Sequence, residues 1–262
     1  MRKTNIGKLG IKGGQPFLID KNSKTGILLL HGFTSTPYQF RELGEYLASN
    51  GFTIFAPLIA GHGTCPEDLA KTTTDDWKNS VKEAYLTLQK KVQKIIIIGN
   101  SFGGNLAFYL AKEFQNDSLI GVISLGTPIM LRFQWFIKLR LYLYGWLKEY
   151  YRKPAMAYRL DYTDMADEVT YPLIPIKSLR EFFKFIKKET IPGLREIKVP
   201  TLIIHANVDF VVNPKSTIYI HQHLGSQYKA IHWVNCSRHL VINSERRQEL
   251  FERIYNFIKE IT

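Results

Sequence analysis

Residues 95–104 have the sequence Ile-Ile-Ile-Ile-Gly-Asn-Ser-Phe-Gly-Gly, in which a β-branched run leads into a glycine-flanked serine. The isoleucines predict a strand that is buried on both faces, and a helical pattern begins near Phe102. Gly-x-Ser-x-Gly between a strand and a helix is typical of a sharp turn that holds a serine clear of the sheet. The backbone at such a serine is strained, and side chains at 99 and 103 would clash, which explains both glycines. Ser101 is therefore the candidate nucleophile.

Further strands and helices alternate on both sides of this turn. Short runs rich in β-branched and other apolar residues predict strands at 27–30, 52–55, 120–125, 202–204 and 230–234. One amphipathic helix is expected over 77–88, with Thr74 or Asp75 as N-cap, and another over 250–261, with Ser244 before it. This alternation predicts an α/β fold with a mostly parallel central sheet flanked by helices.

The alternation breaks once, between about Thr127 and Val199. We therefore expect an α/β core made of residues 1–126 and 200–262, with residues 127–199 as a helical insertion. Within the insertion, Leu179, Phe182, Phe183 and Ile186 share one face of a predicted helix. A long insertion at the functional rim of a sheet usually forms a lid or a binding element, so a helical cap is predicted.

The chain order of the remaining catalytic groups follows from the serine turn, because this arrangement places the acid and then the histidine after the serine. His239 lies between the last predicted strand and the last helix, so it is the predicted general base. Asp209 follows the preceding strand and is the only carboxylate between Glu196 and Glu245. Its predicted role is to orient the imidazole and to stabilise the imidazolium. His205 comes too early in this order to be the base.

The segment His31-Gly32-Phe33 follows the first of the long apolar strands. Ester cleavage passes through a tetrahedral oxyanion, which needs N–H donors held in place before the reaction. The predicted donors are the backbone amides of Phe33 and Phe102. His31 precedes the serine and is interpreted as a structural histidine.

Charge and cysteine content restrict the classes of partner. The 262 residues include 35 basic and 23 acidic side chains, a net charge of +12, but no nucleic-acid-binding motif accompanies them. Cys65 and Cys236 match neither a disulfide framework nor a zinc-ligand spacing, so no metal is expected. No apolar run is long enough to span a membrane, and no apolar run follows the basic residues 1–10. A cytoplasmic location without a nucleic-acid partner is therefore predicted.

Several motifs together resemble the α/β-hydrolase fold of bacterial carboxylesterases and monoacylglycerol lipases. They are Leu-Leu-Leu-His-Gly-Phe-Thr at 28–34, Gly-His-Gly-Thr at 61–64, Asp-Asp-Trp at 75–77, the serine turn at 99–103, Val-Val-Asn-Pro after Asp209, and Ser-Arg-His at 237–239. The similarity covers nearly the whole chain outside the insertion. Arg238 replaces a glycine common before the histidine, and Asn100 and Phe102 stand where Leu and Met are frequent.

The resemblance implies a serine esterase that hydrolyses short- to medium-chain acyl esters or monoacylglycerols through an acyl-enzyme, with no cofactor and with a small helical cap. A thioesterase or an acyltransferase could use the same three residues. A non-catalytic binding protein of the same fold is a further alternative, although it would be expected to lack the serine or the histidine.

Residues 129–153 are rich in aromatic and basic side chains, and Glu149 is their only acidic residue. An apolar helical stripe usually faces a core, so the inner face of the cap is predicted to cover the active site. Ile129, Met130 and Phe133 are the candidate lining residues for the acyl group. Aromatic side chains interspersed with cations also suit a polar–apolar boundary, so the outer face is predicted to contact lipid aggregates or an anionic membrane.

Overall fold

A computed structural model describes residues 14–115, 118–153, 170 and 172–262. Its central sheet has the strand order β1-β3-β2-β4-β5-β8-β9. The strands are β1 (Phe17–Ile19), β2 (Thr25–Leu30), β3 (Thr53–Ala56), β4 (Lys94–Asn100), β5 (Leu119–Leu125), β8 (Thr201–Ala206) and β9 (Lys229–Val234). Only β1 runs antiparallel to its neighbour within this sheet, so the predicted α/β fold with a mostly parallel sheet is confirmed.

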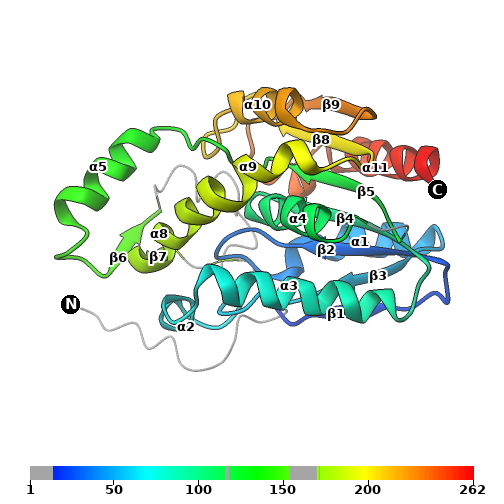
Figure 1. Ribbon diagram of the computed structural model, residues 1–262, viewed down its shortest axis with the longest axis horizontal. Helices are drawn as coiled ribbons and strands as arrows, with labels where there is room; N and C mark the ends of the chain where they lie inside the picture. The colour runs from blue at the N-terminus through cyan, green and yellow to red at the C-terminus, as the bar shows by residue number, and fades with distance from the viewer. Residues whose placement is uncertain (1–13, 116–117, 154–169, 171) are drawn as a thin grey trace.

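Helices cover both faces of the sheet (Figure 1). They are α1 (Arg41–Ser49), α2 (Pro66–Ala70), α3 (Thr74–Gln89), α4 (Phe102–Glu113), α5 (Gln134–Tyr144), α8 (Ile176–Phe185), α9 (Ile191–Gly193), α10 (Lys215–His223) and α11 (Arg247–Ile261). Ile95 and Ile97 of β4 belong to the apolar core that includes residues of α3, α4 and α8, whereas Ile96 and Ile98 belong to the core that includes residues of α1 and α11. The isoleucine run is continuous because successive side chains enter different cores.

Short helical turns complete the chain at Pro37–Phe40, Ile186–Thr190, Leu194–Glu196 and Val241–Asn243. Between residues 127 and 199, α5 projects away from the sheet, and β6 (Tyr150–Arg152) pairs antiparallel with β7 (Leu173–Pro175) (Figure 1). By contrast, α8 packs on the body of the protein, where Ser178 donates to the Leu69 carbonyl at 3.0 Å. Of the four residues predicted to share one face, Leu179, Phe182 and Ile186 are buried there and Phe183 is half-buried.

Three local expectations differ from the structure. Strand β1 was not predicted, because three residues at a sheet edge carry little periodic signal. The N-cap of α3 is Thr73, not Thr74 or Asp75, since its hydroxyl accepts the Asp76 amide while the Asp76 side chain accepts the Thr73 amide. Ser244 does not cap α11, which begins three residues later, although its hydroxyl accepts the Arg246 amide.

Candidate active site

The serine turn is built by the junction of β4 and α4. Ser101 has φ +52° and ψ −120°, a backbone conformation that few residues with a side chain adopt. A Cβ at Gly99 would lie 2.2 Å from the Gly103 carbonyl oxygen, and a Cβ at Gly103 would lie 1.9 Å from the Leu30 carbonyl oxygen. Glycine is thus required on both sides of the serine. The Ser101 amide donates to the Leu125 carbonyl at 2.7 Å, which holds the turn on β5.

Asp209 lies fully buried in the loop after β8 and accepts three well-formed hydrogen bonds. Its Oδ1 accepts the amides of Val211 at 2.7 Å and Val212 at 2.8 Å, and its Oδ2 faces Nδ1 of His239 at 2.7 Å. Burial by itself would raise the pKa of Asp209, but the imidazoles of His239 and His205 outweigh it and hold that pKa well below its usual range. The carboxylate therefore stays ionised and holds the His239 ring in one tautomer.

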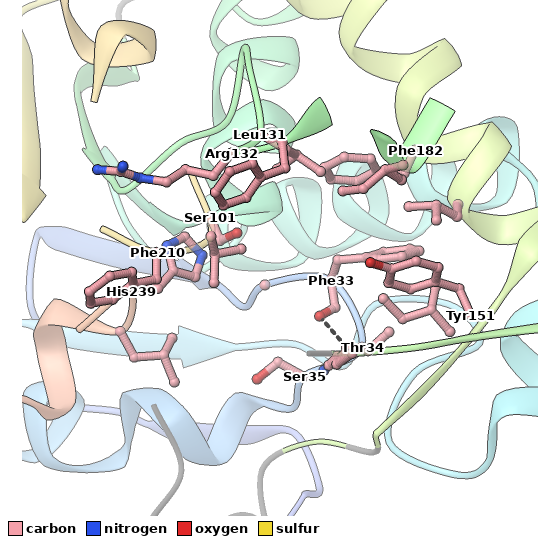
Figure 2. A pocket seen from close by; sticks show the side chains of 18 of the residues that line it. Phe33, Thr34, Ser35, Ser101, Leu131, Arg132, Tyr151, Phe182, Phe210 and His239 are labelled. Carbon is pink, nitrogen blue, oxygen red and sulfur yellow. Dashed lines mark hydrogen bonds between the residues drawn. The ribbon is translucent and has the colours of Figure 1, made fainter. Parts of the chain in front are cut away.

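His239 lies in the loop after β9, with 7% of its surface exposed. Because its Nδ1–H donates to Asp209, its Nε2 carries the lone pair that a general base needs. Both Ser101 and His239 line one cavity, and Figure 2 shows the two side chains beside each other. The three residues chosen from chain order thus come together from three different strand ends.

The loop after β2 lies against the serine. A Cβ at Gly32 would come within 3.4 Å of the Ser101 Cβ, so the backbone approaches closely at this point. Within the described part of the chain, neither the Phe33 amide nor the Phe102 amide has a hydrogen-bond acceptor. Phe102 is also the first residue of α4, where the helix dipole favours negative charge. Both amides can therefore donate to an oxyanion.

Two histidines brace the rim of this loop. His31 is buried, its Nδ1–H donates to the Gly32 carbonyl at 2.9 Å, and its Nε2 accepts the Ile59 amide at 3.0 Å. Burial lowers the pKa of His31 well below its usual value, and burial lowers the pKa of His62 to about 4. Both rings are neutral at neutral pH, and both nitrogens of the His31 ring bond backbone groups, which fits the structural role expected for His31.

His205 is a site residue that the order argument missed. It is fully buried at the end of β8, and its Nε2 lies 3.1 Å from Oδ2 of Asp209. Its Nδ1 lies 2.7 Å from the Thr217 hydroxyl on α10. The order argument considered only the general base, and it did not ask which buried group would support the acid. A histidine four residues before the acid, at the end of the same strand, was the available signal.

A cavity of about 240 Å³ opens in front of Ser101. Its lining is mostly apolar, and Figure 2 shows Ser101, His239 and Phe210 towards one end and Tyr151 and Phe182 towards the other. From α5 and the residue before it, the lining residues are Phe133, Phe136, Ile137 and Arg140. Their spacing is i, i+3, i+4 and i+7, so helical periodicity could have identified this set from the sequence.

Of the three residues expected to line the acyl site, only Phe133 borders the cavity. Ile129 is packed in the core beneath it, with 7% of its surface exposed. The backbone of Met130 instead bonds residues at and before the start of α10: its amide donates to the Ser216 hydroxyl at 3.0 Å, and its carbonyl accepts the Asn213 amide at 2.9 Å. Backbone pairing between 130–132 and 211–213 therefore turns Ile129 and Met130 away from the cavity.

Among the residues that the structure describes, no group of three or more His, Cys, Asp or Glu side chains is placed to hold a metal ion. In the same part of the chain, none of the helices combines the length and hydrophobicity of a bilayer-spanning segment. Cys65 and Cys236 are both free thiols.

The sequence profile of the family described as "Serine aminopeptidase, S33" matches residues 21–246. The chain belongs to this family of α/β-hydrolases. It is similar to the thermostable monoacylglycerol lipase of Bacillus sp. (strain H-257), with 31% identity over 94% of this chain and 95% of that protein. It is also similar to the carboxylesterase of Bacillus subtilis (strain 168), with 24% identity over 94% of this chain and 97% of that protein.

A solved structure extends this similarity to three dimensions. It comes from work on the metagenome-derived lipolytic enzymes LipS and LipT, and it superposes with a TM-score of 0.86 and 25% identity over 96% of this chain and 100% of that one. The resemblance to bacterial carboxylesterases and monoacylglycerol lipases that the motifs indicated is thereby confirmed.

Proposed function

We propose that this hydrolase cleaves carboxylic esters through an acyl-enzyme intermediate on Ser101, and that its substrates are short- to medium-chain acyl esters or monoacylglycerols. The single observation that carries the proposal is the 2.7 Å contact between His239 Nδ1 and Asp209 Oδ2. His239 lines the same cavity as Ser101, whose φ is +52°. An aligned acid and base beside a strained, glycine-flanked serine serve nucleophilic catalysis and have no evident structural purpose.

The chain is a carboxylic ester hydrolase. Family membership supports this class, as do a lipase and a carboxylesterase that match it over 94% of its length. The catalytic residues, the acyl-enzyme and the range of substrates belong to our proposal.

In the proposed mechanism, His239 Nε2 takes the Ser101 proton as Oγ attacks the ester carbonyl carbon. The oxyanion that forms accepts hydrogen bonds from the backbone amides of Phe33 and Phe102. As the tetrahedral intermediate collapses, the carbon–oxygen bond to the alcohol breaks, and His239 returns the proton to the departing oxygen. Water then repeats the sequence on the acyl-enzyme. Asp209 remains ionised throughout and stabilises the imidazolium.

Residues 127–199 serve in this proposal as the cap over the acyl group. From this segment, Phe133, Phe136 and Ile137 line one side of the cavity, and Leu179 and Phe182 line another. Burying an acyl chain among these side chains contributes roughly 0.8 kcal/mol for each methylene group. Longer acyl chains should therefore lower KM until the cavity is filled.

A fluorophosphonate probe tests the proposed nucleophile directly, because only an activated serine reacts. Intact mass should rise by one adduct in the wild type, and peptide mapping should place it on Ser101, with no adduct on Ser101→Ala or His239→Ala. Labelling of a different serine, or none in the wild type, would contradict the proposal. Turnover of octanoyl oxygen esters, octanoyl thioesters and esters with added alcohol acceptors separates an esterase from a thioesterase or an acyltransferase.

We propose in addition that the outer face of α5 and residues 145–148 contacts anionic lipid. Tyr142 and Trp146 have 83% and 77% of their surfaces exposed. The other exposed large apolar residues there are Trp135, Leu139, Leu143, Tyr144 and Leu147, whereas the exposed Phe133 and Phe136 line the cavity. Apolar patches of this kind mark interaction surfaces, and the nearby exposed Lys138 and Lys148 favour an anionic partner. The cytoplasmic location expected from the sequence stays a prediction.

A further inference from the structure

The charged side chains that line the cavity all have the same sign. Arg132, Arg140 and Lys153 line it, and no Asp or Glu is among its described lining residues. A cleft lined by one sign of charge between apolar walls concentrates its electrostatic field and attracts ligands of the opposite charge. A neutral ester needs no such field.

The cations are not equivalent. Arg140 stacks its guanidinium over the Tyr151 ring, 5.6 Å from its centroid, and Lys153 Nζ donates to the Thr170 hydroxyl at 2.7 Å. The Nε of Arg132 donates to the Asp209 carbonyl oxygen, and its backbone amide donates to Val211 at 2.9 Å. The stem of Arg132 is therefore fixed, which prepares the terminal nitrogens for a ligand.

Those terminal nitrogens have no partner in the described part of the chain. No carboxylate forms an ion pair with Arg132 there, and its one side-chain hydrogen bond uses Nε. Figure 2 shows the guanidinium extending over the end of the cavity that holds His239 and Phe210, away from Phe182. A partly exposed, oriented guanidinium with free N–H groups matches the bidentate geometry of carboxylate and phosphate.

The position of His239 decides which part of the substrate meets Arg132. The leaving oxygen must lie within reach of His239 Nε2, because that atom returns the proton to it. The alcohol part therefore lies on the His239 side of Ser101, and the acyl chain extends towards Tyr151 and Phe182.

We propose that the alcohol part of the substrate carries an anionic group, a phosphate or a carboxylate, which pairs with the guanidinium of Arg132. This inference rests on the proposed ester hydrolysis at Ser101 and specifies its substrate class. The anion takes no part in bond breaking. It adds a charge-assisted contact on the alcohol side, where a neutral glycerol would offer only hydroxyl groups.

The test compares three octanoyl esters below their micelle concentrations, so that binding to lipid surfaces does not contribute. They are 1-octanoylglycerol, 1-octanoylglycerol 3-phosphate and the octanoyl ester of glyceric acid. We expect kcat/KM of at least one anionic ester to exceed that of the neutral ester by about tenfold or more at low salt, and the ratio to fall as salt rises. Arg132→Gln should lower that ratio by about ten- to a hundredfold.

The ratio is the informative quantity, because any damage of Arg132→Gln to the Asp209 loop affects both esters. Lys215→Gln removes one exposed cation outside the cavity and should leave the ratio unchanged. Equal kcat/KM for neutral and anionic esters, or a ratio that survives Arg132→Gln, would overturn the inference while leaving the esterase in place. If none of the esters is cleaved and the fluorophosphonate does not label Ser101, the proposed function falls together with the inference.

Discussion

His205 Nε2 lies 3.1 Å from Asp209 Oδ2, so the catalytic-acid candidate faces a second imidazole besides that of His239. The contact is close, although within the described residues it is not aligned as a hydrogen bond. A carboxylate repels an unprotonated ring nitrogen, so the favoured tautomer of His205 directs Nε2–H towards Asp209. Its Nδ1 then accepts the Thr217 hydroxyl. This arrangement assigns His205 a positioning role rather than a catalytic one.

Two substitutions separate the contact of His205 Nε2 with Asp209 from the contact of His205 Nδ1 with Thr217. His205→Gln keeps an N–H donor near the position of Nε2, whereas His205→Asn can replace only the acceptor at Nδ1. We expect His205→Gln to retain kcat/KM within about threefold and His205→Asn to lose about tenfold or more, mainly in kcat, as one interaction with a charged group is lost. Equal losses in both variants, in step with their Tm values, would indicate a purely structural histidine.

The strained backbone of Ser101 predicts that one inactivating substitution, Ser101→Gly, raises the stability of the folded protein relative to Ser101→Ala. Ser101→Ala and Ser101→Gly should both lose about 10⁴-fold or more in kcat. Only glycine relieves the φ of +52°, a strain worth about 1–3 kcal/mol that is partly offset by the greater freedom of glycine in the unfolded chain. We expect Ser101→Gly to raise Tm by roughly 2–4 °C over Ser101→Ala. Identical Tm values would argue against strain at this turn.

The lowered pKa of Asp209 makes its contribution to stability depend on pH. A group whose pKa is lower in the folded protein stabilises it above the unfolded value of about 3.9, and this contribution is lost as the pH falls through the folded value. The free energy of unfolding of the wild type should therefore exceed that of Asp209→Asn at pH 7, and the difference should shrink below about pH 4. Urea unfolding of both proteins from pH 3 to 7 measures it. If the difference between the two free energies of unfolding grew as the pH fell, the lowered pKa of Asp209 would be contradicted.

The same Asp209→Asn variant should lose activity by about 10²- to 10⁴-fold, because it misorients His239 without removing the base. His239→Ala should lose nearly as much as Ser101→Ala, since the two residues act as a unit. Hydrolysis of p-nitrophenyl butyrate measures both. A variant at His31 that is worse than His239→Ala would point to a different base.

The exposed cations Lys138 and Lys148 beside the apolar face of α5 predict stronger binding to vesicles of phosphatidylglycerol than to vesicles of phosphatidylcholine. The double variant Lys138→Gln with Lys148→Gln should weaken the anionic binding by roughly 2 kcal/mol, about thirtyfold, with weaker binding at high salt. Lys187→Gln with Lys188→Gln changes the charge equally on an exposed turn outside α5 and serves as the control. Equal binding of the wild type to both vesicles would remove the electrostatic part of the proposal.

A feature of this fold could be predicted from the sequence when its physical cause lies within a few neighbouring residues. The isoleucines at 95–98 predict β4 because a doubly covered strand needs apolar residues at successive positions, and the glycines at 99 and 103 are explained by clashes within a few residues. The edge strand β1 depends on its pairing with β3, and the bond from Arg132 to the Asp209 carbonyl oxygen spans 77 residues of sequence. His205 is held only when α10 brings the Thr217 hydroxyl to its Nδ1, and Arg132 gains its role only when the loop at 130–132 meets the loop that carries Asp209.

The pairing of residues 130–132 with 211–213 also bears on how caps can be exchanged between related hydrolases. The first residues of the insertion form backbone bonds with the loop that carries Asp209. A chimaera that replaced residues 127–199 would lose these bonds and leave the loop of Asp209 unsupported. A graft that began beyond Arg132 would keep them. In this protein, the interchangeable module therefore starts several residues later than the boundary drawn from the strand pattern.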